Sequence, residues 1–410
     1  MKKAWFLWAL TSFYFFFEWF LRVSPSVLPP FLEKELHTNL MDISTLSVMF
    51  YYPYLFMQIP VGIVVDRFNI KTIMVFVVLV FGLAALGFAQ MPNIYYGYVC
   101  RFIMGLTGAF AFVGTLKIIT LYFDKKRAAL LTGITQGLGM LGAVIGLSPM
   151  YYCFVHYGWH LTLSCLSMVF FLIGTLIWAM KMPQHEAHFK LNRNNLLHDV
   201  KAIISNKFVW FNAVAVGCFY APTVAFGEQW GVSFLSSTHL SLMQSSLVVA
   251  AMFIGMTIGC PILGLISDIV SSRVIVMRWA TWLCLILIAF VIYSSYFHIN
   301  IGYFTLLFLL FWYGFFQGAL VIFYTLSTEL VPLKLTGICI GLTNMASVIV
   351  GAMCIQLMAY LLQYMIYHRA IAVSEVSTAN FQLVFLLFPL SFLIAIVSSY
   401  FIPETSKKTC

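Results

Sequence analysis

The sequence predicts an all-α integral membrane protein with twelve transmembrane helices, arranged as two six-helix bundles related by pseudo-two-fold symmetry. Three observations lead to this prediction. The chain of 410 residues is 62% hydrophobic and only 9% charged, whereas soluble domains carry about 25% charged residues. Its apolar runs are about 20 residues long, which is the length of a membrane-spanning helix. The two halves of the chain also repeat each other's loop motifs.

The apolar runs divide the chain into two sets of six spans. The first set lies near 5–28, 43–65, 72–91, 94–121, 128–153 and 159–180, and the second near 208–235, 243–266, 274–296, 300–328, 335–365 and 379–402. We therefore expect an N-terminal six-helix bundle at 1–180, a cytoplasmic linker at 181–207 and a C-terminal six-helix bundle at 208–410. The first run exceeds a signal-peptide core and ends without a small-residue cleavage site, so we expect it to be retained.

Basic residues predict the orientation of these spans. With the N-terminus inside, 17 of the 22 Lys and Arg residues fall in cytoplasmic segments and only Lys34 and Arg369 in outer loops, which follows the positive-inside rule. We expect a multi-pass protein of the bacterial inner membrane with both termini in the cytoplasm. The net charge of +9 is then a topology signal, and it does not predict nucleic-acid binding.

Two loop motifs at matching positions reveal the internal repeat. The segment after span two reads GIVVDRFNIK (62–71), and the segment after span eight reads GLISDIVSSR (264–273). Both place an acid four residues after a glycine and a base five residues after the acid. An acid near a helix N-terminus is stabilised by the helix dipole, and nearby bases can latch the bundles together. The expected gating residues are Asp66, Arg67, Lys71, Asp268 and Arg273.

At these residues the sequence resembles the major facilitator superfamily. The segment 62–71 is similar to that family's loop 2–3 signature, with Asn69 in place of the usual second glycine, and RFIMGLTGAF (101–110) is similar to its fourth-helix arginine–glycine motif. The resemblance implies a secondary transporter, and a link between Arg101 and proton transfer. RVSPSVLPPFL (22–32) and APTVAFGEQWGVSFL (221–235) look like the bacterial sugar-phosphate and organic-anion permeases.

At two positions this chain differs from subgroups of the family, and these differences restrict the substrates that the resemblance implies. Organophosphate antiporters of that group have a basic residue in both the first and the seventh helix. Span seven of this chain has Glu228 and no arginine, which weakens the expectation of phosphate specificity without removing sugar phosphates from the candidate substrates. Drug–proton antiporters carry a Gly-Pro pair in span five, which GITQGLGMLGAVIG (133–146) lacks.

The first span contains the most informative stretch, FFFEWFLRVSPSV (15–27). Glu18 and Arg22 are four residues apart, so they share a helix face and can pair, with Tyr14 one turn earlier. Charges inside spans usually face a cavity, so Arg22 is a candidate to bind an anionic group and Glu18 to carry a proton. The alternative is a structural ion pair. Pro25 removes a helix hydrogen bond and predicts a kink or local unwinding beside Arg22.

The other charged residues within spans each have two interpretations. Arg101 is either a proton-coupling residue or a buried arginine bonded to carbonyl groups. Lys117 either lines a cavity or extends to the cytoplasmic surface. Glu228, near the outer end of span seven, is a candidate for proton coupling.

Uncharged polar residues deep in the spans are further candidates for substrate binding, although each could instead bond a neighbouring helix. They are Tyr51, Tyr54, Gln58, Gln136, Gln317, Tyr324 and Asn344.

The resulting prediction is a secondary transporter for a small hydrophilic anion or zwitterion, such as an organic acid, amino acid, peptide or sugar phosphate, with proton-coupled uptake. The expected partners are this small molecule, protons and the lipid bilayer, and the protein is expected to act as a monomer. No cofactor or metal is expected, since the scattered cysteines form no CxxC pair and His185 and His188 have no third ligand. The alternatives are an exporter of a siderophore or drug-like compound and a transporter-derived sensor. No constellation predicts an enzyme.

Overall fold

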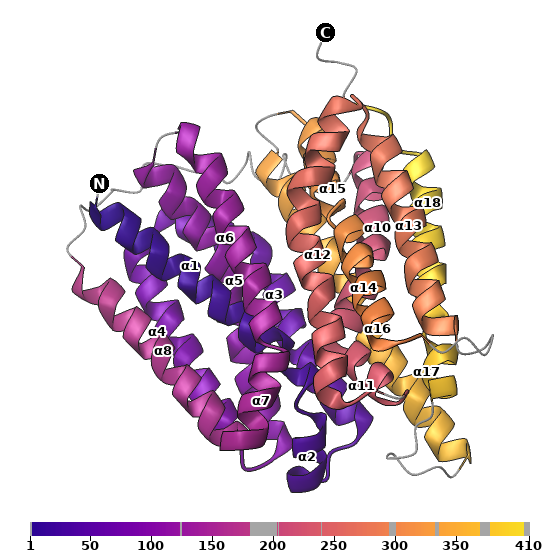
Figure 1. Ribbon diagram of the computed structural model, residues 1–410. Coiled ribbons are helices and arrows are strands. Elements are labelled where there is room, and N and C mark those ends of the chain that lie inside the picture. Colours follow the sequence, from indigo (N-terminus) through magenta and orange to yellow (C-terminus); the bar gives the residue numbers. More distant parts are fainter. Residues whose placement is uncertain are drawn as a thin grey trace. The chain divides into compact units, whose positions relative to one another are not determined.

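The described residues form an all-helical structure. This computed structural model (Figure 1) describes residues 2–123, 125–180, 203, 205–238, 240–294, 301–332, 336–369 and 378–405. It divides into two compact units, Met1–Lys190 and Leu191–Cys410. Most of the predicted linker, with His185 and His188, lies outside the described residues.

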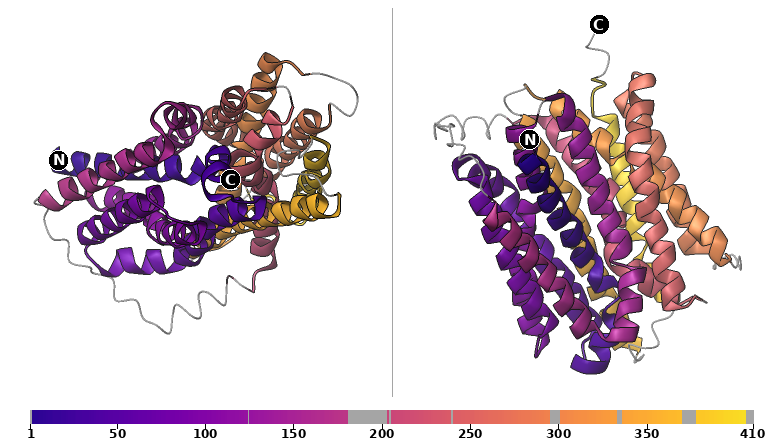
Figure 2. Two further views of the ribbon diagram at one scale, coloured as in Figure 1. Left: turned by 90° about the horizontal axis from the view of Figure 1, so that it is seen from below. Right: turned by 60° about the vertical axis from the view of Figure 1, so that its left-hand side comes forward.

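Unit 1 begins with a helix that is interrupted near its end. Its elements are α1 (Lys2–Val23), the 3₁₀ turn η1 (Ser24–Ser26), α2 (Pro29–Leu36), α3 (Leu40–Arg67), α4 (Ile70–Ala89), α5 (Ile94–Tyr122), α6 (Lys125–Ile145), α7 (Ser148–Tyr157) and α8 (Trp159–Ala179). Within this unit α3 packs on α5, α4 packs on α5 and α8, and α1 packs on α6 and α5. Figure 2 shows the helices of this unit, coloured indigo to magenta, from two further directions.

Unit 2 repeats these helix pairings. Its elements are α10 (Lys207–Pro222), the π-helix η2 (Thr223–Trp230), α11 (Gly231–Ser236), α12 (Leu242–Ile269), α13 (Arg273–Tyr293), α14 (Tyr303–Gln317), α15 (Leu320–Glu329), α16 (Thr336–Arg369), α17 (Thr378–Val384) and α18 (Leu387–Tyr400). Here α12 packs on α14, α10 on α16, and α13 on α18. These pairs correspond to α3 with α5, α1 with α6, and α4 with α8, so the repeat seen in the loop motifs extends to the packing.

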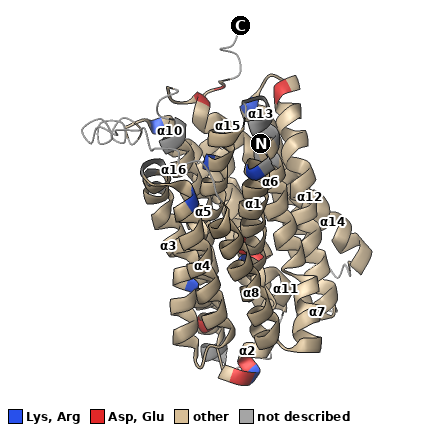
Figure 3. Cartoon of the chain, turned by 90° about the vertical axis from the view of Figure 1, so that its left-hand side faces the viewer, with Lys and Arg blue, Asp and Glu red and all other residues tan. Residues whose placement is uncertain are grey.

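The helices have the length and composition of membrane spans. Within the described ranges, ten are long and apolar enough to cross a bilayer, and Ile134–Ile145 with Ser148–Tyr157, bent by 42°, forms an eleventh. The helix α3 occupies the place of the second predicted span. Figure 3 shows few charged residues along the helix middles. This arrangement fits a bilayer, where helices satisfy their own backbone hydrogen bonds.

Several spans that the sequence predicts as continuous are interrupted. The fifth breaks between α6 and α7, where Pro149 occupies the first turn of α7, because proline has no N–H to bond the Ile145 carbonyl and its ring would clash with that carbonyl in a continuous helix. The tenth breaks between α14 and α15 at Gly318. Apolar runs specify burial in lipid but not helix continuity, so these breaks were not predicted.

The close packing of α3 on α5 depends on a glycine. A Cβ atom added at Gly105 of α5 would lie 2.1 Å from the backbone oxygen of Phe50 on α3. Small residues let helix backbones approach in this way within membranes. Gly105 therefore sets how closely α3 approaches the centre of unit 1.

We expect Gly105→Ala to destabilise the protein, because the Phe50 carbonyl belongs to the backbone and cannot move aside. Overpacking that forces the backbone to shift costs about 1–3 kcal/mol and occasionally more. The measurement is the thermal unfolding midpoint of the purified protein in detergent. Gly137→Ala on α6 is the matched control, since nothing lies within 4 Å of the added Cβ there. Equal midpoints for the two variants would contradict this account of the packing.

Candidate functional site

The first span is broken at the residue that the sequence indicates. The helix α1 ends at Val23, and a 3₁₀ turn with Pro25 follows. This confirms the predicted local unwinding. Because Pro25 has no N–H group, the Leu21 carbonyl loses its helical partner. Ser24 Oγ donates to that carbonyl at 2.8 Å, and so does Arg101 Nη1 from α5 at 2.9 Å.

Arg101 connects the break to two other helices. Its side chain is fully buried. Besides the Leu21 carbonyl, Nη2 donates to the Arg22 carbonyl at 3.3 Å and Nε to the Leu46 carbonyl of α3 at 3.1 Å. These contacts favour the interpretation of Arg101 as a buried arginine bonded to carbonyl groups. One guanidinium therefore joins α1, α3 and α5 at the level of the break.

Glu18 and Arg22 form the ion pair that their spacing predicts. Arg22 Nη2 donates to Glu18 Oε1 at 2.6 Å and Nε donates to the same oxygen at 3.1 Å. Glu18 is fully buried and Arg22 is 4% exposed. The second carboxylate oxygen, Oε2, is buried and has no hydrogen-bond partner among the described residues. Arg22 thus holds Glu18 through one oxygen, which leaves the other available for a proton.

Aromatic rings surround the Arg22 guanidinium. Its Cζ atom lies 4.3 Å from the ring centroid of Trp19, 4.5 Å from that of Tyr54 and 5.3 Å from that of Phe50. Cation–π attraction stabilises the charged guanidinium against these faces. The buried Nε1 of Trp19 has no hydrogen-bond partner within the described ranges. The cluster thus contains a free donor and a free acceptor beside a cation.

Gly108 makes room for the Glu18 side chain. A Cβ atom at this position of α5 would lie 3.3 Å from Glu18 Cγ and 3.4 Å from Oε1. The sequence analysis noted the glycines of 101–110 only as a family motif. Their spacing from Arg101 could have indicated that this face of α5 packs closely on another helix.

Of the other residues predicted in unit 1, Tyr54 contacts the Arg22 guanidinium itself, and Tyr51 contacts the Phe50 ring of the same cluster. Tyr14 points elsewhere, because its hydroxyl donates to the Thr107 carbonyl at 3.0 Å and its ring packs on Phe81 and Phe170. Tyr51 is buried and stacks edge-on against Phe50, and Gln58 donates to the Tyr54 carbonyl at 3.4 Å. Gln136 on α6 and Lys117 on α5 are half-buried.

The polar residues predicted in unit 2 fall into two groups. Gln317 donates to the Phe219 carbonyl at 3.2 Å and to the Tyr313 hydroxyl at 3.0 Å, and its Oε1 has no partner in the part of the chain described. Tyr324 donates to Asn344 Oδ1 at 2.8 Å. Tyr313 was not predicted, although it lies one helical turn from Gln317.

Glu228 lies in an unusual stretch of backbone. It belongs to the π-helix η2, and its side chain is 2% exposed. Segments of π-helix are rare and frequently mark functional sites. The sequence predicted a carboxylate here but not the widened backbone that presents it.

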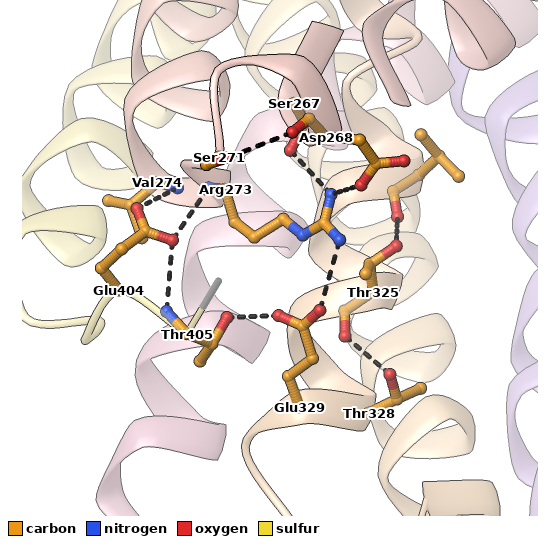
Figure 4. A network of polar contacts seen from close by, with 11 residues as sticks. Ser267, Asp268, Ser271, Arg273, Val274, Thr325, Thr328, Glu329, Glu404 and Thr405 are labelled. Carbon is orange, nitrogen blue, oxygen red and sulfur yellow. Dashed lines mark hydrogen bonds and ion pairs between the residues drawn. The ribbon is translucent and has the colours of Figure 1, made fainter. Parts of the chain in front are cut away.

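The predicted gating residues of unit 2 form a polar network (Figure 4). Arg273 bonds to Asp268, donates to Ser267 Oγ at 3.1 Å and contacts Glu329 Oε1 at 3.4 Å. Glu404 accepts from the backbone N–H groups of Arg273 at 2.9 Å and Val274 at 3.2 Å. The sequence analysis gave no role to Glu404, because a carboxylate that caps α13 from so far along the chain leaves no local signal.

The matching loop of unit 1 is built differently. Lys71 Nζ donates to the carbonyl oxygens of Trp178, at 3.0 Å, and Met180 at the end of α8. Asn69 has φ −62° and caps α4 through its side chain, so it does not need the conformation for which glycine is used. The side chains of Asp66 and Arg67 lie outside those that the structure describes.

Residues 7–355 match the sequence signature of the Major Facilitator Superfamily. The chain belongs to this superfamily. The resemblance to the superfamily, inferred from the loop motif, is confirmed, and this membership points to a transporter and not to an enzyme.

Three bacterial transporters are among the proteins whose sequences are similar to this chain. The uncharacterized transporter YybO of Bacillus subtilis is 24% identical over 277 residues, which cover 62% of each chain. The probable sulfoacetate transporter SauU of Cupriavidus necator is 29% identical over 133 residues, 32% of this chain and 30% of SauU. The probable galactarate/D-glucarate transporter GudP of Bacillus subtilis is 19% identical over 283 residues and 62% of each chain. The matches thus cover less than two thirds of these relatives.

A solved superfamily structure shares the fold. The bacterial homolog of the human lysosomal transporter Spinster, in an inward-facing and occupied conformation, aligns with 98% of this chain and 97% of its own. The TM-score is 0.73 at 12% identity.

We expect Arg101→Lys to destabilise this superfamily member. A lysine concentrates its donors on one nitrogen and cannot reach three carbonyl groups at once. Each buried carbonyl left without a partner costs about 1–3 kcal/mol, so the thermal unfolding midpoint in detergent should fall. The control is Arg278→Lys on α13, where the half-buried arginine bonds to Ser399. An Arg101→Lys midpoint no lower than that of the control would show that the carbonyl contacts contribute little.

Proposed function

We propose that this transporter takes up a small organic acid anion together with a proton by alternating access across the inner membrane. The observation that carries the proposal is the buried Glu18–Arg22 pair, in which one carboxylate oxygen holds the guanidinium and the other is unpartnered among the described residues. Arg22 is assigned to the anionic group of the substrate and Glu18 to the proton.

The charges of the cluster favour an anion. Arg22 and Arg101 contribute two buried cations, and Glu18 contributes one buried anion. A buried charge without a counter-charge is costly, so a cluster of these three residues is more favourable with an added negative group. The guanidinium geometry of Arg22 suits a carboxylate or sulfonate, since both offer oxygens to its planar donors.

A single exchange at Arg22 can couple the proton to the substrate. When Glu18 is ionised, it occupies the Arg22 guanidinium. When a proton binds at Oε2, Glu18 becomes neutral, its attraction for Arg22 weakens, and the guanidinium can bind the substrate anion. The reverse sequence releases both on the other side. One proton then accompanies each anionic group that Arg22 binds.

The named relatives support this substrate class. SauU is a probable sulfoacetate transporter and GudP a probable galactarate/D-glucarate transporter, and these substrates are small organic acid anions. Secondary transporters place their substrate sites near the bilayer midplane and typically form them with discontinuous helices, which suits a charged pair beside the break in the first span. The positive-inside pattern supports cytoplasmic termini, and we propose that the chain acts as a monomer.

We expect Arg22→Lys to reduce uptake of a test anion such as sulfoacetate, galactarate or glucarate into proteoliposomes. The lysine keeps the charge but loses the planar fork, which is worth about 1.5–3 kcal/mol for a charged partner, or about ten- to a hundredfold in apparent affinity. Arg278→Lys is the control that should transport like the wild type. Wild-type affinity in Arg22→Lys would exclude Arg22 as the substrate anchor, and transport only in the outward direction would favour an exporter.

We expect Glu18→Gln to uncouple transport from the proton gradient. Glutamine has the same shape but cannot carry a proton between the two sides, so substrate exchange across the membrane should continue without accumulation driven by a pH gradient. Glu228→Gln is the matched control, because Glu228 is the other buried carboxylate predicted to couple protons. If accumulation persists in Glu18→Gln and is lost in Glu228→Gln, the proton site belongs to Glu228.

A further inference from the structure

A second polar cluster lies in unit 1, where the end of α2 meets the end of α4 and the start of α8. Glu35, in the last turn of α2, contacts two residues at the start of α8. Trp159 Nε1 donates to Glu35 Oε2 at 2.8 Å, and His160 Nε2 lies 2.7 Å from Glu35 Oε1. His160 Nδ1 lies 2.6 Å from the Ala89 carbonyl oxygen at the end of α4. One histidine and one carboxylate thus join α2, α4 and α8.

These contacts require a proton. A carbonyl oxygen can only accept, so Nδ1 of His160 must carry a hydrogen to bond the Ala89 carbonyl. An ionised carboxylate also only accepts, so either Nε2 of His160 carries a second hydrogen or Glu35 is protonated. In both cases the closed cluster holds one proton more than a neutral histidine and a carboxylate that are apart. Without that proton, two lone pairs would face each other at 2.7 Å.

The surroundings fix the histidine and leave it open to water. The Trp159 ring stacks on the imidazole with 3.6 Å between centroids, which opposes rotation of the ring away from its two acceptors. His160 and Glu35 are 45% and 46% exposed, so a proton can exchange with the solvent. The contacts of the cluster therefore need a proton, and this proton can exchange with the bulk solvent.

The carboxyl group of Glu35 responds to these neighbours. Burial opposes its ionisation, but the hydrogen bonds from His160 and Trp159 and the charge of His160 outweigh burial and lower the pKa of Glu35. The other acidic, basic and phenolic groups at this end of α2 and α8 and of the neighbouring α3, α5 and α7 are Glu33, Lys34, His37, Asp42, Tyr95, Tyr96, Tyr98, Tyr151, Tyr152, His156 and Tyr157. Of these, His156 is engaged with Tyr152, whose carbonyl oxygen lies 2.9 Å from its Nδ1.

We propose that Glu35, Trp159 and His160 form a proton-operated latch that holds α2 against the ends of α4 and α8 and opens when the shared proton leaves. A free histidine loses its proton near pH 6.5, at about the middle of the physiological range. The closed latch binds one proton more than the open one above that pH, so closure is favoured at low pH and lost as the pH rises. The helix α2 connects the broken first span, which carries Arg22, to α3, which carries Tyr54. An effect of the latch on transport would rest on the proposed function, but the latch itself does not.

Hydrogen exchange of the α2 amides in the full-length protein tests the latch. With rates corrected for intrinsic chemistry, wild-type protection should fall by about tenfold per pH unit above about pH 6.5, because one proton is released per opening. In Glu35→Gln, the amide can donate to neutral His160 and accept from Trp159, so no proton is required. This variant should show protection of α2 that does not change with pH.

Two results would overturn the proposal. One is wild-type protection of α2 that stays constant between about pH 6 and about pH 9, a range that spans the titration of a free histidine. The other is a pH dependence in Glu35→Gln equal to that of the wild type. His160→Phe should lose protection at every pH, and if it fails to fold, the wild-type titration and Glu35→Gln still decide.

Discussion

The bonds from Arg101 to the broken end of α1 are the interaction on which the rest of unit 1 depends. Pro25 frees the Leu21 carbonyl in a region where water is scarce, and a buried carbonyl without a partner would disfavour this conformation. Arg101 supplies donors to the carbonyl groups of Leu21 and Arg22 and, from the same plane, to Leu46 of α3. The break is therefore held by a residue of another helix and not by its own sequence alone.

This arrangement also brings two cations close together. Both contact the Phe50 ring, whose centroid lies 5.3 Å from Cζ of Arg22 and 4.8 Å from Cζ of Arg101. Each guanidinium is attracted to the ring, while Glu18 offsets part of their mutual repulsion. Gly105 and Gly108 let α3 and Glu18 approach α5 closely enough for these contacts. The close helix packing at Gly105 and Gly108 and the contacts between the charged groups therefore depend on each other, because both involve α5.

The sequence predicted the features that depend on local spacing. Apolar runs gave the spans, the i, i+4 spacing gave the Glu18–Arg22 pair, and Pro25 gave the break. The partners of Arg101 could not be predicted, because carbonyl acceptors on α1 and α3 carry no residue-specific signal and lie 55 and 80 residues away. Glu404 was missed for the same reason. The break before Pro149 was missed because the apolar run continues through it, although proline itself was a usable signal.

The two loop motifs show that repeated positions need not repeat their contacts. Lys71 and Arg273 occupy matching places, yet Lys71 bonds the carbonyl end of α8, where a cation complements the helix dipole, while Arg273 bonds two carboxylates of its own unit. The N-terminus of α4 is capped by its own Asn69, whereas that of α13 is capped both by its own Ser272 and by Glu404 from beyond α18. A conformational change that moves α8 must therefore disturb the first motif, and one that moves the segment after α18 must disturb the second. The internal repeat places a basic residue at the same position in both units, and the sequence differences between the units determine which neighbouring element that residue contacts.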